Sequence, residues 1–316
     1  MTTAFVFPGQ GSQSVGMLSD LAAREPIVEQ TFADASDVLG YDLWHLCQRG
    51  PAEELAQTTV TQPAMLTAGV ATYRVWREHE GRVPKMMAGH SLGEYTALVC
   101  ADAVDFETAV DLVRFRGEAM QAAVPAGQGA MAALLGLDDA DVEAVCAEAS
   151  NDDDVVVAAN YNSPGQIVIA GDAPAVERAI ELASQRGAKR AIRLPVSVPS
   201  HSPLMQPAAA RLAERLASVD LRVPEETIVY TIDLKTHTSE EGIRRALTEQ
   251  LVKPVLWSQT VAKMIADGAT TVVECGPGKV LTGLNRRIDR RREIAMLALE
   301  DAASVEQALA IEGERR

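Results

Sequence analysis

The sequence has few cysteines and aromatic residues, and it has no long apolar run. Its 316 residues include four cysteines, while Phe, Trp and Tyr together make up 4%. The cysteines are far apart and form no Cys-x-x-Cys pair, which excludes the spacing of a zinc site or a disulfide framework. We therefore expect reduced core thiols in a cytoplasmic protein that binds no metal; they are Cys47, Cys100, Cys146 and Cys275.

Positive charge is also scarce. Lys and Arg number 29 against 44 for Asp and Glu, which gives a net charge of -15. A chain this acidic is a poor partner for nucleic acid or for an anionic membrane, and we expect neither. No stretch of about 18 apolar residues is present, so no membrane span is expected. Residues 1–5 lack a basic segment, and we expect no signal peptide.

Apolar residues nevertheless make up 47% of the chain, enough for a sizeable core. Short apolar runs alternate with amphipathic helical patterns, such as those over 17–39 and 63–79, which predicts a mostly parallel α/β sheet. Between residues 126 and 195 the rhythm changes to strand, helix, two strands, helix and strand, the order of a ferredoxin-like unit. We therefore predict a large domain from residues 1–125 and 196–316, interrupted by a small domain at 126–195.

The segment Gly89-His90-Ser91-Leu92-Gly93 follows a short apolar run and precedes a run of helix formers. This strand, tight turn and helix is the context in which Gly-x-Ser-x-Gly presents a serine nucleophile. The motif also occurs as an ordinary turn of small residues. Ser91 is therefore a candidate nucleophile on this evidence.

A second glycine-flanked loop, residues 8–13, follows the apolar run Ala4–Phe7. It lacks the spacing and the lysine of a nucleotide-binding loop, which excludes that function. Two interpretations remain: a plain turn between strand and helix, or a loop that presents the Gln10 N–H at the end of the strand.

Arg116 is out of place in its helical pattern. At 100° per residue it falls on one line with Ala109, Val113 and Met120, whereas Arg114 falls on the charged face. A guanidinium on an apolar stripe is costly unless it meets an anion. Two interpretations remain. Arg116 forms an internal ion pair or extends its charged end to the edge of the core, or it is a clamp for a ligand carboxylate, whose shape its planar fork matches.

His201 lies among prolines, which restrict the loop on both sides of it. These prolines are Pro195, Pro199, Pro203 and Pro207. A lone loop histidine is more often a surface residue than a catalytic one. Opposite a candidate nucleophile, it becomes the best general base that this chain offers.

Together these segments resemble malonyl-CoA:acyl carrier protein transacylases of bacterial fatty acid synthesis. The resemblance runs from Phe5 to about Arg287. It rests on six segments in the family's order, namely residues 7–13, 89–95, 114–117, 160–166, 198–201 and 276–281. The resemblance implies a hydrolase-like α/β domain with an inserted ferredoxin-like one, which agrees with the pattern above.

The resemblance also implies roles. Ser91 would be the nucleophile and His201 the base, with the Gln250 backbone carbonyl orienting the ring in place of an aspartate. The backbone N–H groups of Gln10 and Leu92 would form the oxyanion hole, and Arg116 would hold the malonyl carboxylate. The implied partners are malonyl-CoA and acyl carrier protein, with no cofactor, and we expect a monomer.

One segment departs from the family. Where an asparagine is usual near the end of a predicted strand, 228–232, this chain has Tyr230-Thr231-Ile232-Asp233. The departure leaves the candidate nucleophile, arginine and histidine intact.

Three other functions share some or all of these residues. A lipase-like hydrolase would use Ser91 and His201 but would need an acidic triad member and an apolar acyl pocket, and Arg116 opposes such a pocket. Whether water or a thiol accepts the acyl group distinguishes the hydrolase from the transacylase. A free-standing acyltransferase for a polyketide synthase shares every residue and differs in carrier protein and extender unit. A catalytically silent carrier-protein binding module would not need both Ser91 and His201.

Overall fold

The structure is a computed structural model that describes residues 2–196 and 198–314. The elements before residue 125 are β1 (Thr2–Phe7), α1 (Ser19–Ala22), α2 (Pro26–Leu39), α3 (Leu43–Arg49), α4 (Ala52–Leu55), α5 (Thr58–Glu78), β2 (Met86–Gly89), α6 (Gly93–Cys100) and α7 (Phe106–Ala123). The next are β3 (Gly129–Leu135), α8 (Asp139–Ala149), β4 (Val156–Ser163), β5 (Gln166–Asp172), α9 (Ala173–Gln185) and β6 (Arg190–Arg193). The last are the 3-10 turn η1 (Pro203–Met205), α10 (Gln206–Leu216), β7 (Thr227–Ile228), α11 (Glu240–Glu249), α12 (Trp257–Ala266), β8 (Ala269–Cys275), α13 (Val280–Ile288), β9 (Ala295–Leu299) and α14 (Ala302–Glu314).

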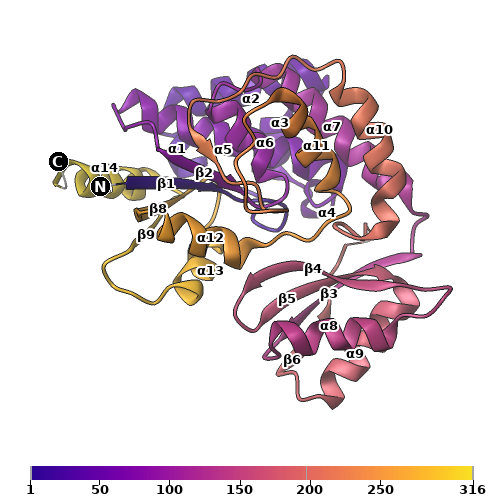
Figure 1. Ribbon diagram of the computed structural model, residues 1–316. Helices are drawn as coiled ribbons and strands as arrows, with labels where there is room; N and C mark the ends of the chain where they lie inside the picture. The colour runs from indigo at the N-terminus through magenta and orange to yellow at the C-terminus, as the bar shows by residue number, and fades with distance from the viewer. Residues whose placement is uncertain (1, 197, 315–316) are drawn as a thin grey trace.

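The larger sheet has five parallel strands in the order β7-β2-β1-β8-β9. Side chains alternate across β1, as a strand buried on both faces requires. Phe5 and Phe7 join the main core with α2, α5, α6 and α7, while Ala4 and Val6 pack with α12 and α13 on the other face (Figure 1). The expected parallel α/β layer is therefore confirmed.

The smaller sheet is antiparallel, in the order β4-β5-β3-β6. Helices α8 and α9 bury one of its faces, as Figure 1 shows at the lower right. Its other face carries a small apolar cluster that includes Met131 and Val168. This order of strands and helices is the ferredoxin-like one predicted from the sequence. The domain boundaries at 126 and 195 stay a prediction.

Backbone hydrogen bonds join the smaller sheet to the segment that precedes α12. The Val255 N–H donates to the Ala159 carbonyl at 2.8 Å, and the Tyr161 N–H donates to the Val255 carbonyl at 2.9 Å. The chain entering α12 thus pairs with β4 as a one-residue parallel bridge. This contact fixes the position of β4 beside the larger sheet.

Two local predictions were wrong. Pro63 is not the first residue of a helix, because α5 begins at Thr58 and Pro63 lies inside it. Extensive burial of α5 offsets the donor that proline lacks. The strand predicted at 228–232 ends at Ile228, and the chain turns at 231–234, where the Leu234 N–H donates to the Tyr230 carbonyl at 3.0 Å.

Candidate active site

Ser91 lies on a tight turn between β2 and α6. Its backbone φ is 53°, a left-handed conformation that a non-glycine residue adopts only under constraint. The turn is packed so closely that a Cβ on Gly89 would lie 1.8 Å from the Gly93 carbonyl carbon. The His90 N–H, one residue earlier, donates to the Phe7 carbonyl of β1 at 2.9 Å. These contacts hold the Ser91 hydroxyl at the end of the sheet.

His201 reaches Ser91 from the loop before η1. Its Nε2 lies 2.8 Å from Ser91 Oγ, and its Nδ1 lies 2.8 Å from the Gln250 backbone oxygen. Because a carbonyl can only accept, Nδ1 carries the proton and Nε2 is free to accept one from the hydroxyl. Burial, reinforced by the positive charge of Arg116, lowers the His201 pKa to about 3. The imidazole is therefore neutral and can act as a base at ordinary pH.

Arg116 lies directly beside the serine. It is 1% exposed, and its Nη2 donates to Ser91 Oγ at 3.2 Å and to Gln250 Oε1 at 2.8 Å. Its Nη1 donates to Gln62 Oε1 at 2.7 Å, and its Nε has no partner among the described residues. All three partners are neutral, and burial lowers the arginine's pKa. Arg116 therefore forms no direct ion pair within the described residues, and a buried cation faces the serine.

Two backbone N–H groups border the same space. Leu92 immediately precedes the first residue of α6, and Gln10 follows Gly9 in the loop after β1. Neither N–H donates a backbone or side-chain hydrogen bond to another described residue. A Cβ on Gly9 would lie 2.4 Å from the His90 carbonyl oxygen, so the glycine lets the Gln10 loop approach the turn. Free N–H groups of this kind can receive a developing oxyanion.

These groups line one cleft, with a cavity volume of about 120 Å³, between the two sheets. The larger unit contributes Gln10, Ser91, Leu92, Arg116 and His201. The segment 126–195 contributes apolar and amide side chains, namely Met131, Asn160, Val168 and Leu194, and Val196 directly follows it. The structure therefore brings all of the sequence-predicted site residues together, with Gln250 directly behind them.

The sequence reading missed four polar partners of the site. Gln62 binds Arg116, and His90 Nε2 lies 2.8 Å from Asn162 Oδ1 on the smaller sheet. The buried Glu94 accepts a hydrogen bond from the Gln250 side chain at 2.5 Å. His90, Glu94 and Asn162 lie within segments that carry the family resemblance, and Glu94 has a further signal, because it is the only charged residue in α6.

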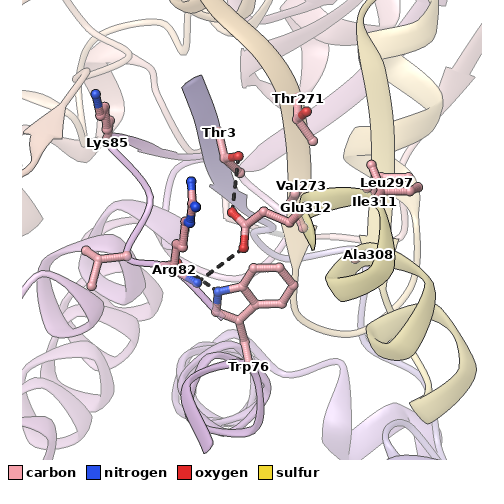
Figure 2. A pocket seen from close by; sticks show the side chains of 11 residues that line it. Thr3, Trp76, Arg82, Lys85, Thr271, Val273, Leu297, Ala308, Ile311 and Glu312 are labelled. Atoms are coloured by element: carbon pink, nitrogen blue, oxygen red, sulfur yellow. Dashed lines mark hydrogen bonds between the residues drawn. The ribbon is translucent and has the colours of Figure 1, made fainter. Parts of the chain in front are cut away.

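A second cavity of about 70 Å³ lies at the opposite ends of β1 and β8 (Figure 2). Several of its polar groups bind one another: Glu312 of α14 accepts from Thr3 Oγ1 at 3.4 Å and from the Arg82 N–H at 3.3 Å. Trp76 Nε1 donates to the Arg82 carbonyl at 2.9 Å. The cavity is a packing seam between α14 and the sheet.

The described residues contain no group of three or more His, Cys, Asp or Glu side chains that could hold a metal ion. No helix among them is both long and apolar enough to cross a membrane.

A parallel α/β sheet that presents a serine on a tight turn, with a neutral histidine and free N–H groups beside it, is typical of enzymes that pass acyl groups through a serine ester. Comparison with known proteins narrows this class. The model of the acyl transferase domain family matches residues 4–301. The malonyl CoA-acyl carrier protein transacylase of Escherichia coli K12 is 59% identical over 285 residues, which cover 90% of this chain and 92% of that protein. The protein of the same name in Bacillus subtilis is 45% identical, and the match covers 97% of this chain and 96% of that protein.

Solved structures agree. The malonyl CoA-acyl carrier protein transacylase of Coxiella burnetii superposes with a TM-score of 0.96 at 49% identity, covering 98% of this chain and 97% of that one. A malonyl-transacylase solved in complex with its type II PKS acyl-carrier protein gives a TM-score of 0.96 at 51% identity, covering 98% and 100%. The chain belongs to the acyl transferase family and, within it, to the malonyl CoA-acyl carrier protein transacylases.

Proposed function

We propose that this acyltransferase moves the malonyl group of malonyl-CoA to the phosphopantetheine thiol of an acyl carrier protein in fatty acid synthesis. The observation that carries the choice of acyl group is Arg116. A buried guanidinium beside Ser91, whose direct hydrogen-bond partners are all neutral, keeps its charge available to bind an anionic group of the substrate. A malonyl carboxylate matches its planar fork, whereas an acetyl group offers no charge.

In the first half-reaction, Ser91 Oγ attacks the thioester carbonyl while His201 Nε2 takes the hydroxyl proton. The N–H groups of Gln10 and Leu92 stabilise the oxyanion, where a single donor is typically worth about 3 kcal/mol. The tetrahedral intermediate collapses, the C–S bond breaks, and coenzyme A leaves with the proton from His201. The product is a malonyl ester of Ser91.

In the second half-reaction, the carrier protein's thiol attacks that ester while His201 takes the thiol proton. The ester C–O bond breaks, and His201 returns the proton to Ser91 Oγ. The order is ping-pong, and the acyl group itself comes from the substrate, so the protein's own side chains are sufficient. The Gln250 carbonyl keeps His201 in the tautomer that both steps need.

The acceptor distinguishes this function from that of a hydrolase. The protein is incubated with malonyl-CoA, with and without a carrier protein that bears phosphopantetheine, and free coenzyme A, free malonate and malonyl carrier protein are measured. The proposal predicts that malonyl carrier protein accounts for most of the coenzyme A released. Release of malonate at the same rate in both reactions would instead indicate a thioesterase.

A second candidate differs only in the carrier protein. The likeness to a malonyl-transacylase solved with a type II PKS acyl-carrier protein favours testing a polyketide synthase as the recipient. The kcat/KM values for a fatty acid synthesis carrier protein and for a polyketide synthase carrier protein, measured side by side, decide between the two pathways.

We also propose the two-domain division at residues 126 and 195. For location, we propose the cytoplasm, which the four free and buried cysteines support because a reducing compartment keeps thiols unpaired.

A further inference from the structure

Glu94 is a fully buried carboxylate directly behind the serine turn, on the first turn of α6. Three hydrogen-bond donors converge on its two oxygens. The Thr231 N–H and hydroxyl donate to Oε1 at 2.8 and 2.7 Å, and Gln250 Nε2 donates to Oε2 at 2.5 Å. Because a carboxylate can accept all three bonds and a carboxylic acid must itself donate one, this arrangement suits the ionised form.

The Gln250 side chain has one orientation that satisfies its neighbours. Its Nε2 also donates to the Ser91 carbonyl at 3.0 Å, and its Oε1 accepts from Arg116 Nη2 at 2.8 Å. A carbonyl only accepts and a guanidinium only donates, so the amide cannot be turned over without losing both bonds. The backbone oxygen of the same residue accepts from His201 Nδ1. Gln250 thus contacts the nucleophile, the base and the arginine.

We propose that Glu94 is a positioning residue for acyl transfer: through Gln250, its carboxylate holds His201 and Arg116 in their working geometry. The inference rests on the proposed function, because it assigns Glu94 to that same site. Glu94 touches neither the substrate nor the reacting atoms. Its negative charge is separated from Arg116 by the Gln250 side-chain amide, which bonds to both. Because Glu94 does not bind Arg116 directly, the guanidinium stays free to bind a substrate carboxylate.

Thr231 belongs to this arrangement. It lies in the segment that departs from the family's usual asparagine, and it supplies two of the three donors to Glu94. The turn at 231–234, which replaced the predicted strand, places both donors on one carboxylate oxygen. Thr231 therefore contacts Glu94, which in turn contacts Gln250 behind the active site.

Glu94 also titrates where the enzyme would work. Burial raises its pKa to about 7, while the bonds from Thr231 and Gln250 and the positive charge of Arg116 on α7 oppose that rise. The other titratable groups that face it are Tyr95 on α6 and Tyr230 before the turn, both with raised pKa values. His201, near 3, has already lost its proton in this range. Acylation should therefore increase with pH through about 7, as Glu94 ionises.

The experiment measures the rate of Ser91 acylation, by rapid quench, across this pH range with malonyl-CoA and acetyl-CoA. Three forms of the full chain are compared: wild type, Glu94→Gln and Glu274→Gln. Glu274 is the matched control, since it is also a fully buried glutamate with a raised pKa, but it accepts from the Leu281 and Thr282 N–H groups of α13. Melting temperatures are recorded for all three.

We expect the wild-type rate to rise through a single ionisation near pH 7. In Glu94→Gln an amide replaces an oxygen that must accept, so either Gln250 or Thr231 loses its partner. The malonyl rate should fall roughly 10- to 100-fold, by analogy with the loss when a group that orients a metal ligand is removed. The ionisation near 7 should disappear, and the preference for malonyl over acetyl should shrink. Glu274→Gln should keep the wild-type rates and pH profile.

Thr231→Val provides the second variant, because it keeps the charge and the shape and removes one donor to Glu94. It should raise the pH at which the rate increases. The inference is overturned if Glu94→Gln keeps the wild-type rate, acyl preference and pH profile, if the wild-type rate is flat through pH 7, or if Thr231→Val leaves the profile unmoved. A wild type that forms no malonyl-serine at any pH refutes the proposed function instead.

Discussion

At the scale of single residues, the two groups that face each other across the cleft share a strained backbone. Ser91 has φ 53° and His201 has φ 62°, both in the left-handed region. Such residues cost on the order of 1–3 kcal/mol each and persist only where the surrounding contacts over-determine them. These two backbone conformations point the side chains toward each other, with Ser91 Oγ 2.8 Å from His201 Nε2.

Removal of the base tests this pairing. His201→Ala should lower the rate of Ser91 acylation by a factor on the order of 10² to 10⁴, the usual contribution of a positioned general base. The rate is measured by quenched flow with malonyl-CoA, and circular dichroism checks that the fold is kept. Acylation at close to the wild-type rate would assign the base to another residue.

Arg116 gives the second prediction at this scale. Truncation of one partner of a buried charge pair costs about 2–5 kcal/mol, and each 1.4 kcal/mol is about tenfold. Arg116→Ala should therefore lose roughly 30- to 4000-fold in kcat/KM for malonyl-CoA. Acetyl-CoA, which has no carboxylate to leave unpaired, should lose less or even gain. Equal losses for both substrates would show that the arginine has a structural role.

At the scale of elements, the site depends on two loops packed at the ends of neighbouring parallel strands, β1 and β2. The sequence predicted both loops and their strands, because glycines, short apolar runs and helix formers are local signals. It also placed Arg116 on a buried face by helical periodicity alone. It could not predict the bonds from Gln62, Asn162 and Glu94, because each joins elements far apart in the chain. Apart from the family resemblance, His201 could be proposed only by elimination, since proline content fixes a loop's stiffness but not where the loop lies.

The close packing of Gly89 against Gly93 in the serine turn leads to a prediction about stability. Gly89→Ala would place a Cβ 1.8 Å from the Gly93 carbonyl carbon, and backbone on both sides cannot move aside cheaply. We expect a loss of more than ~3 kcal/mol in the free energy of unfolding, beyond the usual cost of overpacking. Gly283→Ala is the control, since a Cβ there meets nothing within 4 Å on α13, and it should be neutral or stabilise by ~0.5–1 kcal/mol. Urea unfolding measures both; similar midpoints for the two variants would contradict the packing argument.

At the scale of the whole molecule, function requires a strongly acidic enzyme to bind a carrier protein, a class that the family resemblance implies to be acidic too. Two anions repel at long range, so docking needs a local basic surface. The exposed arginines of the segment 286–292 are one candidate, and Lys189 with Arg190 is the other. The structure connects them: Arg287 Nη1 donates to Gln166 Oε1 at 2.6 Å, and Gln166 and Arg190 both pair with Leu135. The two candidates thus flank one end of the smaller sheet.

Charge reversal tests this surface. Arg290, Arg291 and Arg292 changed to Glu should raise the KM for the carrier protein several-fold, while the first half-reaction with malonyl-CoA barely changes. The difference should shrink with added salt, because exposed charges are screened beyond about 8 Å at physiological ionic strength. Reversal of the exposed Arg24, Arg49 and Arg82 makes the same change in net charge elsewhere and is the control. An unchanged KM at low salt would exclude the 290–292 segment from the docking surface and leave Lys189 and Arg190 as the candidate to be tested.

Passage of the malonyl group through Ser91 is tested most directly by intact-protein mass spectrometry. Wild type and Ser91→Ala are each mixed with malonyl-CoA, acetyl-CoA or methylmalonyl-CoA, quenched in acid and weighed. We predict that wild type gains the mass of one malonyl group and loses it when carrier protein is added, whereas Ser91→Ala folds normally and gains nothing. A malonyl adduct that persists in Ser91→Ala would contradict the account.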